Sequence, residues 1–110
     1  MSEVEERPYV VEERRTIAGT DDLVVKVFTL AEGQEIPWHY HSNVTDTFFC
    51  LEGMLLVETR APRARHEMAV GASCAVPART AHRVSGKDGK RCRFLIVQGI
   101  GTYDFKAVGG

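Results

Sequence analysis

Two histidines separated by one residue, His39 and His41, are the residues of this sequence best suited to chemistry. In a β-strand the side chains of residues i and i+2 leave the same face, so both imidazoles would point the same way. Such a pair supplies two of the ligands that a metal ion needs. Asp46 follows five residues after His41, and His82 comes much later in the chain. These four side chains are the candidate metal ligands.

Strand alternation indicates which other side chains share the interior with these candidates. If Asp46 faces inward, then Phe48 and Cys50 face inward with it. In the last long strand, Arg91 and Arg93 should face water, which turns inward the residues Cys92, Phe94, Ile96 and Gln98. An apolar interior with a few convergent polar groups is typical of a small-molecule site. We therefore predict a substrate pocket lined by Phe48, Cys50, Phe94 and Gln98, with a small core residue as the alternative for Cys50.

Short β-strands must carry these side chains. Residues 23–30 are apolar except for Lys26 and Thr29 and are rich in β-branched residues, which predicts a strand buried on both faces. Further strands are expected at 9–11, 15–18, 37–41, 46–51, 54–57, 67–70, 73–76, 81–85 and 91–98. Two hairpin turns are expected, at 52–53 and 86–89, and a basic loop at 60–65. No segment has sustained helical spacing, so the pattern indicates an all-β sandwich or barrel.

Length and composition predict one ordinary globular domain over residues 1–110. We expect an N-terminal arm or edge strand at 1–18, a barrel at 23–98 and a tail at 99–110. No apolar run approaches the roughly 20 residues of a membrane span, so no membrane partner is expected. The acidic N-terminus is no secretory signal, and the three cysteines form no Cys-x-x-Cys pair. Reduced thiols in a cytoplasmic protein are the expectation.

The charge is uneven along the chain. Residues 1–35 carry a net charge of −5 and residues 36–110 a net charge of +4. The acidic arm could lie on a basic body, its own or a partner's, or it could be a solvated tail. No part is basic enough to indicate a nucleic-acid partner. Residues 9–18 read as strand yet precede the candidate site, and exchange of an edge strand protects a sheet edge, so we predict a homodimer.

The spacing of the candidate ligands resembles the first sequence motif of the cupin family. That motif is a Gly, five residues, His-x-His, three or four residues, a Glu, six residues and a Gly. The sequence matches it in every spacing, with Asp46 in place of the Glu, through the residues Gly33, His39, His41, Asp46 and Gly53.

The second cupin motif is matched in part. Gly71, Pro77 and His82 stand where that motif has its first Gly, its Pro and its His. Arg79 replaces the inner Gly, and Gly86 replaces the final Asn. The change at Arg79 affects the turn more than the metal site, and it could place a guanidinium near the pocket mouth. The resemblance covers residues 23–98, most of the chain.

The resemblance implies a small double-stranded β-helix, a jelly-roll-like barrel, with a divalent metal held inside one end. The family's ligands correspond here to His39, His41, Asp46 and His82. Neutral imidazoles suit Fe, Mn, Ni, Cu or Zn, and the set lacks the thiolates of a structural zinc site. Four ligands leave about two positions of a six-coordinate ion open for substrate or O₂. One carboxylate on a divalent ion leaves a positive charge, which favours an anionic or chelating small molecule.

Three hypotheses follow. The first is an enzyme that uses the metal for dioxygenation, isomerisation or lyase chemistry on an oxygen-rich substrate. The second is a non-catalytic module, such as a sensor, that binds a metal and a small ligand. The third is a structural barrel without metal, which a bound metal would exclude. The first two differ in whether other polar groups, with Gln98 and Arg79 as candidates, converge on the metal. Arg60, Arg63 and Arg65 could bind a carboxylate or phosphate, with a solvated loop as the alternative.

Overall fold

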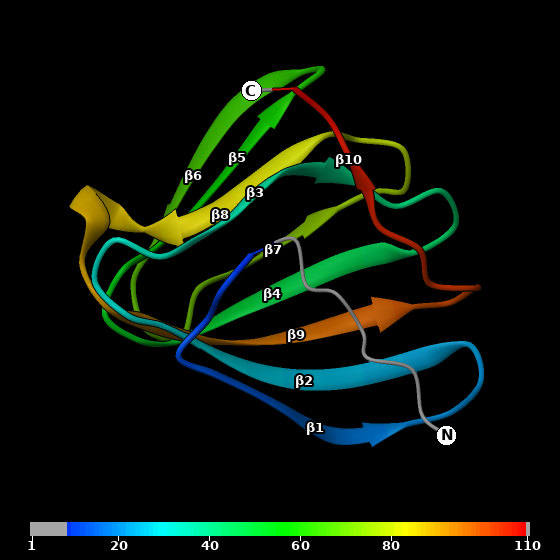
Figure 1. Ribbon diagram of the computed structural model, residues 1–110, viewed down its shortest axis with the longest axis horizontal. Coiled ribbons are helices and arrows are strands. Elements are labelled where there is room, and N and C mark those ends of the chain that lie inside the picture. The colour runs from blue at the N-terminus through cyan, green and yellow to red at the C-terminus, as the bar shows by residue number, and fades with distance from the viewer. Residues whose placement is uncertain (1–8, 110) are drawn as a thin grey trace.

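Two five-stranded antiparallel sheets form the architecture of the computed structural model, which describes residues 9–109 (Figure 1). The elements are β1 (Glu13–Gly19), β2 (Leu23–Leu30), β3 (Glu35–Tyr40), β4 (Thr45–Glu52), β5 (Leu55–Arg60), β6 (Arg63–Met68), β7 (Ser73–Val76), β8 (His82–Gly86), η1 (Lys87–Gly89), β9 (Cys92–Gly99) and β10 (Lys106–Ala107). The first eight residues of the expected N-terminal arm lie outside the described residues. Within residues 9–109, no helix is long and apolar enough to cross a membrane.

The predicted all-β, jelly-roll-like fold is confirmed, and of the two expected forms, sandwich or barrel, the structure is an open two-layered sandwich. One sheet has the strand order β1-β2-β9-β4-β7 and the other β10-β3-β8-β5-β6. The chain passes repeatedly from one sheet to the other, and each sheet keeps its own two edge strands. Because neither edge of one sheet is hydrogen-bonded to an edge of the other, the layers pack face to face without closing.

Both expected hairpin turns instead carry the chain between the sheets. The turn at Glu52-Gly53 links β4 to β5, yet β4 pairs with β7 and β9 whereas β5 pairs with β6 and β8. The 3₁₀ turn η1 joins β8 to β9 across the layers in the same way. Gly53 has a φ of 74°, and a β-carbon there would lie 2.6 Å from the Arg91 carbonyl oxygen. A tight glycine turn therefore marks a corner here, although the local sequence looks like a hairpin.

The expected basic loop at 60–65 contains a true hairpin. Arg60 pairs with Arg63 across the β5–β6 turn, and the Thr59 hydroxyl donates a 2.7 Å hydrogen bond to the Pro62 carbonyl. Arg63 and Arg65 belong to the edge strand β6, where charged residues are frequent, whereas Arg60 ends the neighbouring β5. The N-terminal strand also differs, because β1 begins at Glu13 and residues 9–11 are not a strand.

The hydrophobic core lies between the sheets, on the inward face that alternation predicts. Phe48, Phe94 and Ile96 are buried in it, and Phe28 stacks on Phe94 with ring centroids 5.3 Å apart. Burial of one such side chain contributes about 1.5–3 kcal/mol. Burial of β2 on both faces is confirmed only for residues 27–30, since residues 23–26 are half-buried. The half-buried part of β2 contains Lys26.

Candidate metal centre

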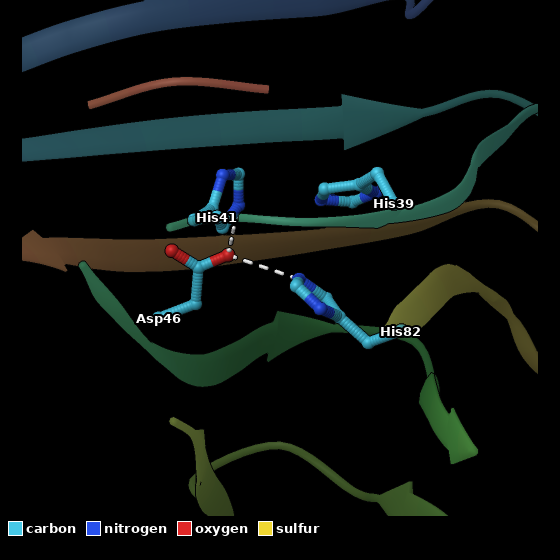
Figure 2. A group of neighbouring side chains, drawn as sticks. All are labelled: His39, His41, Asp46 and His82. Carbon is cyan, nitrogen blue, oxygen red and sulfur yellow. Dashed lines mark hydrogen bonds and ion pairs between the residues drawn. The ribbon is translucent and has the colours of Figure 1, made fainter. Parts of the chain in front are cut away.

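The four candidate ligands meet at one end of the sandwich, and both sheets contribute to them (Figure 2). His39 lies next to the end of β3, opposite His82 of β8, whereas Asp46 is the second residue of β4 in the other sheet. The β3–β8 register shifts between Ile36 and His39, a segment that contains Pro37. Proline cannot donate a ladder hydrogen bond, so it favours such an irregularity. The shift lets both Ile36 and His39 face the interior although they are an odd number of positions, three, apart.

The ligand atoms of the cluster are close and shielded from solvent. Asp46 Oδ2 lies 2.9 Å from His41 Nε2 and 3.1 Å from His82 Nε2. All four candidate ligand atoms lie within 4.8 Å of one another, and each residue is at most 3% exposed. Adjacent ligands of an octahedral ion at about 2.1 Å would be about 3 Å apart. The four atoms are therefore close enough together for one transition-metal ion to bind among them.

Backbone carbonyls fix how each imidazole faces the cluster. The acceptors are Pro37 O, 2.7 Å from His39 Nδ1, Asp104 O, 2.6 Å from His41 Nδ1, and Thr80 O, 2.8 Å from His82 Nδ1. Because a carbonyl oxygen only accepts, each Nδ1 must carry the hydrogen. In a neutral imidazole this leaves the lone pair on Nε2, which is the arrangement found in metal-ligating histidines.

Without a cation the cluster holds more acceptors than donors. A neutral Nε2 and the Asp46 carboxylate both accept, so contact between them requires an added proton or a metal ion. Burial alone would raise the pKa of Asp46, but hydrogen bonds from His41 and His82 outweigh it and hold that pKa below its usual range. Burial opposes protonation of His41, yet Asp46 outweighs it and raises the His41 pKa. Burial and the neighbouring His82 lower the pKa of His39 to about 3.

Gln98 holds the carboxylate from the side away from the histidines. It lies opposite Asp46 in the β4–β9 register, and its Nε2 donates a 3.0 Å hydrogen bond to Asp46 Oδ1. Its Oε1 is buried and has no hydrogen-bond partner within the described part of the chain. Gln98 thus orients Asp46 and leaves one acceptor open.

A small cavity of about 20 Å³ lies beside the cluster. Of the four predicted pocket residues, Phe48 and Gln98 line it. Phe94 and Cys50 lie in the hydrophobic core, and the Cys50 thiol contacts the carbonyl oxygens of Glu52 and Gly53 at the β4–β5 turn. Strand alternation predicted correctly that these two side chains face the interior, but it could not predict how far they lie from the cluster. The cavity is large enough for about one water molecule.

Three aromatic residues that we did not assign to the site cover the cluster. Phe105 stacks on His39 with ring centroids 4.3 Å apart, and Tyr103 lies 5.1 Å from His41. Tyr9 packs on Phe105 at 5.6 Å. The sequence contained a sign of this, because Tyr103 and Phe105 are two positions apart and in an extended tail their side chains would face the same side. We call these three residues the aromatic cap.

Lys26 is the other residue that sequence reasoning missed. Its side chain lines the same cavity as His41, Asp46 and Gln98. The signal was a charged residue with the inward parity of Phe28 inside an otherwise apolar strand. Lysine is seldom turned toward the interior unless its charge is paired, so an inward lysine indicates a role in binding rather than in packing.

The basic residues considered from the sequence lie outside the cluster. Arg60, Arg63 and Arg65 line a groove of about 700 Å³ on the β5–β6 hairpin, where Arg60 lies over the Trp38 ring. Arg79 is exposed and is not among the described residues that line the small cavity. Its backbone N–H donates a 2.7 Å hydrogen bond to the His41 carbonyl.

Comparison with known proteins places this geometry in a family. The sequence profile described as a cupin domain matches residues 26–98. No match was found among curated proteins. Among solved structures, an uncharacterized protein with a double-stranded β-helix domain from Klebsiella pneumoniae is 21% identical, with a TM-score of 0.72 over 89% of this chain and 84% of that chain.

Two further structures share the fold at low identity. KdgF from a Halomonas species is 17% identical, with a TM-score of 0.69 over 86% of this chain and 89% of that chain. An oxalate oxidase is 15% identical, with a TM-score of 0.66 over 79% of this chain and 46% of that chain. At these identities the likeness shows the fold alone.

Proposed function

Because the chain belongs to the cupin family, we propose that it binds one divalent transition metal and, at that metal, a small anionic organic molecule. The metal would be held by His39, His41, Asp46 and His82. Fe, Mn, Ni or Zn is expected from the donor set of three imidazoles and one carboxylate. When bound, such an ion supplies Lewis-acid or oxygen-activating chemistry.

One observation carries the proposal: the buried cluster directs acceptors at a common point and leaves them short of donors. The three Nδ1 atoms donate outward to carbonyls, so the Nε2 lone pairs and the Asp46 carboxylate converge. A cation compensates such a set, whereas a structural sandwich without metal would gain nothing from burying it. The metal-free structural hypothesis is therefore the least supported of the three.

The chain's own residues supply orientation and exclusion of water. Backbone carbonyls orient the imidazoles, Gln98 orients Asp46, and the aromatic cap covers the side chains that would hold the ion. Polar groups other than the ligands, Lys26 and Gln98, line the cavity. Their convergence favours the enzyme hypothesis, by dioxygenation, isomerisation or lyase chemistry, over the non-catalytic binding module, which we retain as the alternative.

Metal analysis of variants tests the proposal. Protein loaded with one metal and then desalted should retain about one ion per chain by elemental analysis. His39→Ala and His82→Ala should lose most of that metal, because each loses a ligand that points into the cluster. His66→Ala, on the edge strand β6, is the matched control and should keep it. Full occupancy in His82→Ala would show that the ligand set is wrong.

Asp46 is tested by two variants in the same assay. Asp46→Ala should weaken metal affinity by about tenfold or more, because a ligand and a counter-charge disappear together. The effect should be smaller than that of losing His39 or His41. Asp46→Glu should retain binding, since it keeps the carboxylate and adds one methylene of reach. Competitive chelation measures both affinities. Unchanged affinity in Asp46→Ala would leave a three-histidine site.

We also propose a homodimer, which apolar residues on the outer face of the β1 sheet support. Val25 pairs with Val97 and Leu95 pairs with Phe49 on this face, and Phe49 is 38% exposed. The sequence analysis expected the two chains to exchange their N-terminal edge strands. That exchange is a less direct way to form the dimer, because β1 pairs with β2 of its own chain. Light scattering at micromolar concentration tests the proposal, and a monomeric mass would contradict it.

Three free cysteines support a further proposal, a cytoplasmic location. We also propose that residues 23–98 carry the function, while Tyr9 in the segment before β1 and the tail after β9 complete the site.

A further inference from the structure

We propose that Lys26 and Gln98 form a recognition pair that selects small hydroxycarboxylates for the metal centre. The Lys26 ammonium would pair with the carboxylate, and Gln98 Oε1 would accept a hydrogen bond from the hydroxyl. This inference rests on the proposed function, because the pair lines the cavity beside the four candidate ligands. It adds the class of compound that the cavity takes.

The orientation of the Gln98 amide follows from its neighbour. Asp46 Oδ1 can only accept, so the Gln98 NH₂ group must face it, at 3.0 Å. The carbonyl Oε1 is thereby turned away, and it is buried without a partner among the described residues. A buried acceptor without a donor is unfavourable, because it has given up its hydrogen bonds to water. A ligand that brings a donor to this position relieves that penalty, and a hydroxyl group is such a donor.

Lys26 supplies the positive charge on the same side of the cavity. It is the only lysine or arginine among the described residues that line the cavity. Its Nζ lies 5.1 Å from the centre of the Tyr103 ring, and that ring lies 5.1 Å from the His41 ring. An ammonium group at the edge of an apolar cavity pairs strongly with a carboxylate, because little water screens the two charges.

The distance between the two groups limits the size of the ligand. Lys26 pairs with Ile96 across β2 and β9, and Gln98 is two residues further along β9 on the same face. Diagonal neighbours of this kind are about 7–8 Å apart. Two adjacent carbons bearing a carboxylate and a hydroxyl fit within that span, once the flexible lysine reaches toward the ligand.

Tyr103 occupies the space between Lys26 and His41 and is 43% exposed. A cavity of about 20 Å³ does not admit an organic molecule, so the ligand must take the place of the Tyr103 ring. The ammonium would then exchange its contact with the ring for one with the carboxylate. A dicarboxylate without a hydroxyl brings only acceptors and leaves Gln98 Oε1 unpaired, so it should bind less well than its size and charge suggest.

Three probes that differ by one group separate the two contacts. Glycolate has the carboxylate and the hydroxyl, acetate lacks the hydroxyl, and glycolamide lacks the charge. Each is titrated by calorimetry into the metal-loaded wild-type protein and into Lys26→Met and Gln98→Met, with the metal content of every sample measured. Lys90→Met, an exposed lysine before β9, is the matched control.

Lys26→Met should weaken glycolate and acetate about tenfold and leave glycolamide unchanged. Gln98→Met should weaken glycolate and glycolamide about fivefold and leave acetate unchanged. The acetate titration also reports any general damage from the lost contact with Asp46, and Lys26→Arg should restore glycolate binding.

Equal effects of Lys26→Met on all three probes would overturn the proposal, as would the absence of any effect. So would failure of all three to bind the metal-loaded wild-type protein. A wild-type protein that retains no metal would instead refute the proposed function itself, so the two failures are distinguishable.

Discussion

Arg79 has a backbone φ of 66°, in the left-handed region that side chains with a β-carbon seldom adopt. This conformation explains why the related motif has glycine here, and why the substitution affects the turn more than the cluster. The residue's N–H still donates to the His41 carbonyl, which a glycine could do equally well.

Arg79→Gly should raise the free energy of unfolding by up to about 1 kcal/mol. It removes a left-handed penalty of about 1–2 kcal/mol, which the greater chain entropy of unfolded glycine partly offsets. Arg79→Val should lower stability, because a β-branched side chain fits this conformation worst. Urea unfolding measures both, and metal affinity should not change in either. A destabilised Arg79→Gly would show that the guanidinium makes a stabilising contact.

At the scale of the elements, the tail between β9 and β10 does more than end the chain. Its Asp104 carbonyl accepts from His41 Nδ1, its Asp104 carboxylate accepts from the Ser42 N–H at 2.8 Å, and its Phe105 ring covers His39. The segment therefore both orients a candidate ligand and covers the cluster.

Phe105→Ala should speed the release of metal to a chelator about tenfold, because it removes the ring that shields His39 from solvent. Stability should fall by about 1–2 kcal/mol through lost burial. Val108→Ala is the control, since Val108 is half-buried in the same tail and its backbone bonds to Trp38. Equal release rates in the two variants would show that the cap is no barrier. Stopped-flow chelation measures the rates.

The predicted elements show where sequence reasoning succeeded and where it could not. Alternation placed Asp46, Phe48 and Phe94 on the correct face, because side-chain parity is a local property. The partner of a strand is not local, so Glu52-Gly53 looked like a hairpin although it joins two sheets. Similarly, the parity of Lys26 indicates an inward side chain, but nothing near Lys26 or Asp104 in the sequence shows that either lies beside His41 or its cavity. These contacts depend on which distant strands meet.

At the scale of the whole molecule, the buried imidazoles should give the metal-free protein its highest stability near pH 6.5. Below that value the unfolded chain takes up a proton at His39, whereas the folded protein does not, because the folded pKa of His39 is about 3. The free energy of unfolding therefore falls by about 1.4 kcal/mol for each unit by which the pH is lowered. Above it, the stabilisation from protonated His41, whose folded pKa is raised, is lost as pH rises through that pKa.

Urea unfolding of metal-free protein between pH 5 and 8.5, at constant salt, measures this profile. His39→Gln should flatten the acid side, whereas His66→Gln, on the edge strand β6, should not. Metal should remove the alkaline loss, because coordination replaces the proton on His41. Unchanged stability between pH 5 and 6.5 in the metal-free wild type would contradict the assignment for His39.

The candidate ligands come from both layers: His39 and His82 from the β3–β8 sheet, and Asp46 from the β4–β9 sheet. An ion bound to all of them would cross-link the two sheets. The cross-link would lie at the end where the aromatic cap, rather than the main core, fills the interior. The opposite end, with Cys50, Leu55 and Cys92 in its core, needs no such fastening. Removal of the ion would therefore let the two sheets separate more easily at the end that holds the cluster, while the opposite end stays packed.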